Sequence, residues 1–119
     1  MHAMALVLML AQVGPERLLN AAKEPQNWLT YNGGYASLHH SGLASITPAN
    51  VGKLGLSWAF QARSLEKFEV TPIVADGVMY ITEAPSTVIA LDPASGRIFW
   101  TYEHKLPDDW GGYNVSFFT

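Results

Sequence analysis

The sequence predicts an all-β fold: about one four-stranded antiparallel sheet, preceded by a lead-in of short helices and extended chain. Two observations predict it. Short apolar runs that alternate with polar residues recur from residue 56 onward, and turn signals such as Asp76-Gly77 separate them. The stretch from Ala90 to Trp100 then joins the end of one strand to the start of another through a tight turn.

The lead-in contains two helix signals and one extended stretch. Pro15 and the acidic residue after it suit a helix N-terminus, so we expect a helix over residues 17–23. Residues 26–35 interleave aromatic and turn residues, which is typical of an extended chain laid over a surface. Thr47 followed by Pro48 predicts the N-cap of a second helix of one or two turns.

Five apolar segments follow, and the later ones complete the sheet. The alternation predicts strands in residues 56–61, 70–75, 78–82, 87–91 and 97–102. Asp76-Gly77 is a hairpin signal between two of them, because both residues tolerate a positive φ. These strands predict a single antiparallel unit of the size of one propeller blade.

The stretch that begins at Ala90 has the pattern Ala-x-Asp-x-x-x-Gly-x-x-x-Trp. The small Ala90 permits close approach of a neighbouring sheet, and Asp92 can accept hydrogen bonds from backbone N–H groups ahead of it. Gly96 supplies the positive φ of the turn, and Trp100 can lie across the turn of an adjoining sheet. We therefore expect a motif that docks one blade on the next, with a chance hairpin and a buried tryptophan as the alternative.

Composition excludes several classes of function. The 119 residues are 49% hydrophobic and 14% charged, with a net charge of −3 and no basic run, so a nucleic-acid partner is not expected. There is no cysteine, which excludes disulfides, thiolate metal sites and a cysteine nucleophile. Residues 3–11 form an apolar run too short for a membrane span. The run looks like part of a secretory signal peptide without its basic start, and a buried helix is the alternative.

Four motifs occur in order: residues 28–35, 43–54, 69–80 and 102–109, the last with Leu106-Pro107. Together with the docking pattern, they resemble the N-terminal part of alcohol dehydrogenases that carry pyrroloquinoline quinone (PQQ). The resemblance extends from Glu16 to Asp109 and implies a fragment of an eight-bladed β-propeller. It predicts four segments: a signal-peptide remnant at residues 1–13, the lead-in at residues 14–54, one blade at residues 55–106, and a divergent start of the next segment at residues 107–119.

The resemblance implies one cofactor-binding residue, Glu69, which in this family lies just ahead of an innermost strand and helps to hold PQQ. A solvated Glu69 beside Lys67 is the alternative. The adjacent cysteines of many family members are missing, because Tyr113 and Asn114 stand in their place. No catalytic or metal-binding residue of the family is expected within this segment.

Other candidate groups have simpler explanations. Adjacent His39 and His40 would point to opposite faces of a strand, so a surface or packing role is expected over a metal site. Asp108 and Asp109 are expected in a solvated loop.

By resemblance, the complete enzyme oxidises primary alcohols to aldehydes with PQQ and a Ca²⁺ or lanthanide ion. It passes electrons to a cytochrome c in the periplasm, and the fragment alone is expected to be inactive. Two alternatives remain: a non-catalytic propeller scaffold of the outer-membrane assembly type, and an inactive truncated remnant. Glu69 and the lead-in from Trp28 to Tyr35 favour the enzyme, because blade docking requires neither.

Overall fold

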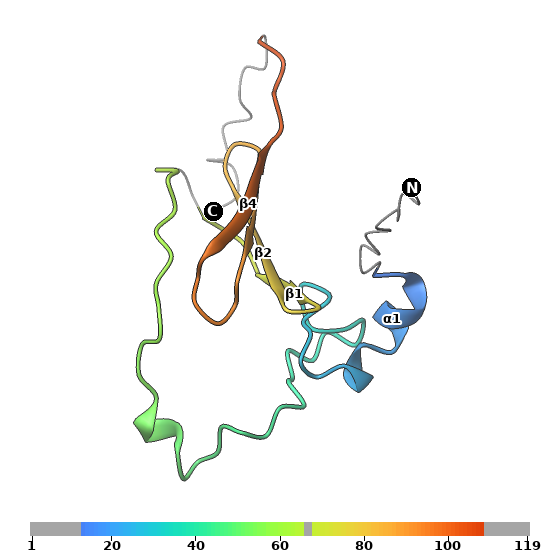
Figure 1. Cartoon of the computed structure of the whole chain (residues 1–119). Helices are drawn as coiled ribbons and strands as arrows, with labels where there is room; N and C mark the ends of the chain where they lie inside the picture. The colour runs from blue at the N-terminus through green and yellow to red at the C-terminus, as the bar shows by residue number, and fades with distance from the viewer. Residues whose placement is uncertain (1–12, 66–67, 109–119) are drawn as a thin grey trace, which may run out of the picture.

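The predicted four-stranded antiparallel sheet is confirmed. The computed structural model (Figure 1) describes residues 13–65 and 68–108, and its strands pair in the order β1-β2-β3-β4. They are β1 Ile73–Ala75, β2 Val78–Glu83, β3 Thr87–Leu91 and β4 Ile98–Glu103. Each strand pairs with its sequence neighbour, so only local hairpins are needed to build the sheet.

The β1–β2 hairpin has the tight turn that its two central residues predict. Asp76 and Gly77 have φ values of 50° and 80°, the left-handed pair that matches the twist of a two-residue hairpin. Ala75 and Val78 face each other across the turn and set the register.

One face of the sheet, which we call the core face, carries the buried aliphatic residues. Ile81 pairs with Ile89 and Met79 with Leu91 across the β2–β3 ladder. Ile81, Ile89 and Leu91 are buried, and Phe60 and Val70 pack against them from the chain that precedes β1. The core face is therefore covered by residues from outside the sheet.

The opposite face, which we call the aromatic face, is less covered. Ala90 pairs with Tyr80 on one side and Trp100 on the other. The two aromatic rings lie 6.0 Å apart, centroid to centroid, and Ala90 is completely buried. A larger side chain at the central position would stand between the rings, which explains the alanine. Trp100 is still 47% exposed and Tyr102, two residues further on the same face, is 56% exposed.

The lead-in forms only short helices. Helix α1 covers Pro15–Leu19, followed by the 3₁₀ turns η1, Ala21–Lys23, and η2, Val51–Lys53. The predicted helix over residues 17–23 is thus two short pieces. The N-cap prediction for Thr47 is wrong, because its backbone N–H instead donates to the Asn50 side chain and the 3₁₀ turn begins only at Val51.

Backbone and side-chain contacts attach the lead-in to the β1 side of the sheet. Trp28 and Val74 exchange backbone hydrogen bonds of 2.8 and 3.0 Å, an isolated antiparallel bridge on the open edge of β1. Arg17 bonds both carboxylate oxygens of Asp76 and both of Glu24. The bonds to Asp76 and Glu24 raise the pKa of Arg17, and Arg17 lowers the pKa of each carboxyl group.

The expected strand over residues 56–61 is not formed. This segment belongs to a long stretch of chain that runs beside the sheet and joins no ladder with it (Figure 1). A strand needs a hydrogen-bonding partner, and the described residues offer none at this position. The radius of gyration is 18.0 Å, compared with roughly 14 Å for a compact domain of this length. The chain is therefore open, with its contacts concentrated around the sheet.

Candidate functional site

Glu69 lies just ahead of the core residue Val70, in the chain that leads into β1. Its side chain is exposed and makes no hydrogen bond or ion pair with the part of the chain that the structure describes. Lys67, the partner in the alternative interpretation, lies outside the described residues. Among the described residues, none occupies the hydrogen-bonding capacity of this carboxylate.

The turn between β3 and β4, residues 92–96, has the internal hydrogen bonds that the docking pattern predicts. The Asp92 carboxylate accepts the Ser95 hydroxyl proton at 2.6 Å and the Ala94 N–H at 2.9 Å. The hydroxyl bond, followed by the N–H bond, lowers the pKa of Asp92. Gly96 has a φ of 71°, as predicted, and its N–H donates to the Asp92 carbonyl at 2.8 Å.

The tryptophan that covers this turn is Trp58, from the chain that precedes the sheet. Its indole Nε1–H donates to the Pro93 carbonyl at 3.1 Å. A Cβ atom on Gly96 would stand 2.5 Å from the nearest atom of the Trp58 ring, so only glycine leaves room for the indole. Phe60, two residues later, packs against the buried residues of the core face. We call the 92–96 turn together with the core face the docking seat.

The sequence carries a signal for this contact that the docking pattern alone does not include. Trp58-Ala59-Phe60-Gln61 and Trp100-Thr101-Tyr102-Glu103 share the order Trp, small residue, aromatic residue, Gln or Glu. An aliphatic residue stands two positions before each tryptophan, and their separation matches the roughly 40–50 residues of a propeller repeat. Trp58 therefore lies on the turn of this sheet in the way that Trp100 is predicted to lie on the turn of the next sheet.

The lead-in contains the same kind of contact, a tryptophan packed on a left-handed glycine. The Trp28 ring covers Gly33, whose φ is 78°, and a Cβ there would lie 2.7 Å from the ring. Its Nε1–H donates to the Tyr31 carbonyl at 3.3 Å. Trp28 and Trp58 thus follow a common rule: each indole lies on a left-handed glycine and bonds a carbonyl of the same turn.

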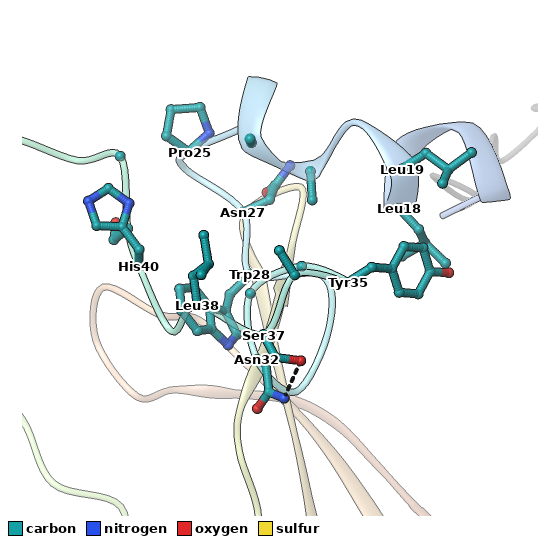
Figure 2. A pocket seen from close by; sticks show the side chains of 17 residues that line it. Leu18, Leu19, Pro25, Asn27, Trp28, Asn32, Tyr35, Ser37, Leu38 and His40 are labelled. Atoms are coloured by element: carbon teal, nitrogen blue, oxygen red, sulfur yellow. Dashed lines mark hydrogen bonds between the residues drawn. The ribbon is translucent and has the colours of Figure 1, made fainter.

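The described residues enclose two cavities, and Trp28 lines the first of them. The first, of about 460 Å³, lies between α1 and residues 32–42, with Trp28 and Leu38 on its wall (Figure 2). The second, of about 450 Å³, lies between the core face and residues 60–64. Buried Glu83 lines the second cavity, and its carboxylate accepts a hydrogen bond from the Ser64 N–H. Glu69 lines neither cavity.

The histidine pair does not come together with other metal-ligating groups. The His39 ring lies edge-on to Tyr31 with centroids 6.5 Å apart, and His40 lines the first cavity. Within residues 13–65 and 68–108, no group of three or more His, Cys, Asp or Glu side chains could hold a metal ion. No helix in these ranges has the length and hydropathy to cross a membrane. Asp109, Tyr113, Asn114 and the signal-peptide region 1–12 lie outside the described residues.

Comparison with known proteins accounts for this arrangement. The family described as PQQ, glucose/ethanol/alcohol dehydrogenase, beta-propeller domain, matches residues 28–116. A quinohemoprotein alcohol dehydrogenase of Pseudomonas putida is 42% identical over 78% of this chain and 13% of its own length. The 1-butanol dehydrogenase (cytochrome c) of Thauera butanivorans is 45% identical over 71% of this chain and 12% of its own length.

A solved structure shows the same fold. A europium-containing methanol dehydrogenase superimposes with a TM-score of 0.68 at 33% identity, over 77% of this chain and 16% of that one. The chain thus spans about an eighth of the length of the curated relatives that it matches. The four-stranded sheet is one blade of a propeller, and the described residues form only part of the complete propeller.

Proposed function

The chain belongs to the PQQ β-propeller family of glucose, ethanol and alcohol dehydrogenases, and we propose that it is the N-terminal part of an enzyme that oxidises primary alcohols to aldehydes. The observation that carries the proposal is the match over residues 28–116, which includes both the blade and the extended lead-in. A scaffold propeller would need the blade alone. The segment contributes structure and one wall of a cofactor site, and we expect it to be inactive by itself.

We propose that Glu69 helps to hold PQQ in the complete protein. The fit rests on chemistry: PQQ carries a ring N–H, and an exposed carboxylate without a partner among the described residues can accept a hydrogen bond from it. When bound, the quinone supplies the oxidant, as cofactors do in dehydrogenases of this kind. The proposed role of Glu69 is to position the cofactor.

The metal ion and the electron acceptor are inferred from relatives. One structural neighbour is named a europium-containing methanol dehydrogenase, and one relative is named for cytochrome c. We propose that a Ca²⁺ or lanthanide ion binds through residues outside this segment and acts as a Lewis acid on the alcohol oxygen. We further propose a periplasmic location and transfer of electrons to a cytochrome c.

Replacing Glu69 with glutamine in the complete protein tests the cofactor site. The change preserves size but removes a charge and converts an acceptor into a mixed donor and acceptor, so PQQ affinity should fall about 10- to 100-fold. The measurement is a titration with PQQ that follows the absorbance of the quinone.

The matched control is Glu16→Gln, the same chemical change on an exposed side chain of α1. This control should bind PQQ as the unaltered protein does. Unaltered affinity in the Glu69→Gln protein would show that Glu69 is a solvated surface residue.

A further inference from the structure

The core face ends in a row of polar side chains, at the end of the docking seat away from the 92–96 turn. Thr87 lies in the middle of this row, where it pairs with Glu83 on β2 and with Glu103 on β4. Glu103 is exposed, whereas Glu83 is only 7% exposed. Among the described residues, Glu83 is the one charged side chain that is buried, and charged side chains are rarely buried without a specific partner.

The buried carboxylate of Glu83 has a backbone partner in place of a cation. Burial of a charge is costly unless an opposite charge or hydrogen bonds compensate for it. Within residues 13–65 and 68–108 the ion pairs are those of Arg17, and none of them includes Glu83. The carboxylate instead accepts a hydrogen bond from the Ser64 N–H, and a charged acceptor makes such a bond strong. This contact fixes the backbone at Ser64 on the end of β2.

Ser64 lies in the chain that leads to Glu69. Strands β1 and β2 are antiparallel, so this chain enters β1 at the end of the sheet where β2 finishes with Glu83. Val70, directly after Glu69, packs against the buried residues of the core face. The chain is therefore held on the sheet on both sides of Glu69. A segment that is fixed at both ends has less conformational freedom to lose when it binds a ligand.

We propose that Glu83 is a positioning residue for the cofactor site: it holds Ser64 and thereby keeps Glu69 where it can bind PQQ. The inference rests on the proposed role of Glu69 and adds a residue that acts through the backbone. Without the carboxylate acceptor, the binding arrangement of the segment is populated less often. The apparent affinity for PQQ falls in proportion to that population.

The test compares variants of the complete protein by titration with PQQ. Glu83→Leu preserves the approximate size of the side chain but removes the acceptor, so PQQ affinity should fall about 10-fold. Glu83→Gln retains an acceptor oxygen for the Ser64 N–H, so its affinity should stay within about 2-fold of the unaltered protein. Glu103→Leu is the matched control, because it makes the same change in the same row on an exposed side chain. It should bind PQQ as the unaltered protein does.

Two measurements separate positioning from a general loss of stability. In this chain, Glu83→Leu should speed hydrogen–deuterium exchange at the Ser64 amide about 10-fold and leave the amides of β3 unchanged. In the complete protein, Glu83→Leu/Glu69→Gln should bind PQQ within about 2-fold of Glu69→Gln alone, because Glu83 acts through Glu69. If Glu83→Leu does not fold, Ser64→Pro removes the donor without a change in the sheet and should give the same loss of affinity.

The outcomes distinguish this proposal from the cofactor site on which it rests. If Glu69→Gln weakens PQQ binding but a folded Glu83→Leu protein retains its affinity, the role of Glu83 is overturned and the cofactor site stands. Equal losses in the Glu83→Gln and Glu83→Leu proteins, or additive losses in the double variant, also overturn that role. Unaltered affinity in the Glu69→Gln protein would overturn the cofactor site and this proposal together.

Discussion

Alanine in place of Gly96 is expected to destabilise the chain by about 3 kcal/mol. Roughly 1–2 kcal/mol arises because an L-residue must adopt the left-handed φ of 71°. A similar amount arises because the new Cβ would lie 2.5 Å from the Trp58 ring and displace the indole from the turn. Urea unfolding followed by circular dichroism measures the change.

Gly77→Ala is the matched control. Gly77 has an equally left-handed φ of 80°, but an added Cβ meets nothing within 4 Å. This substitution should cost about 1–2 kcal/mol, the conformational part alone. Equal losses at the two glycines would show that Trp58 contributes nothing to the turn.

Removal of Trp100 is expected to have a large effect only in the complete protein. In this chain Trp100 is half-exposed and contacts Tyr80, so Trp100→Ala should cost about 1 kcal/mol, the scale of an aromatic pair. In the complete protein, where we predict that the indole lies on the corresponding turn of the next blade, the loss should be about 3–5 kcal/mol.

Phe99→Ala controls for the loss of an exposed aromatic residue from the same strand. Phe99 is 44% exposed and stacks against the Arg97 guanidinium, 5.2 Å from the ring centroid. Its removal should cost about the same in both proteins. A Trp100→Ala cost below about 1 kcal/mol in the complete protein would contradict blade docking by this residue.

The hairpins could be predicted from the sequence because their information is local. Asp76-Gly77 and the Asp92-to-Gly96 turn each specify their own backbone conformation, and β3 has the predicted bounds. The segment 56–61 has an equally regular alternation but forms no strand. Alternation of apolar and polar residues indicates that a segment can be half-buried in a sheet. Strand formation also requires a neighbouring strand with free hydrogen-bonding groups.

The site was harder to predict because its contacts are distant in sequence. The pattern predicts the turn conformation at Asp92 and Gly96, which the structure shows, but the tryptophan that covers the turn comes from residue 58. The shared residue order around Trp58 and Trp100 is the sequence signal for this contact. Glu69 has no partner among the described residues, so its role rests on family resemblance and stays a prediction.

The proposed quinone enzyme is tested most directly by a PQQ titration of the complete protein with a Ca²⁺ or lanthanide ion present, followed by addition of a primary alcohol. We predict stoichiometric binding of the quinone and an alcohol-dependent loss of its oxidised absorbance, which a cytochrome c restores. A complete, folded protein that binds no PQQ would contradict the proposed function and indicate a scaffold propeller instead.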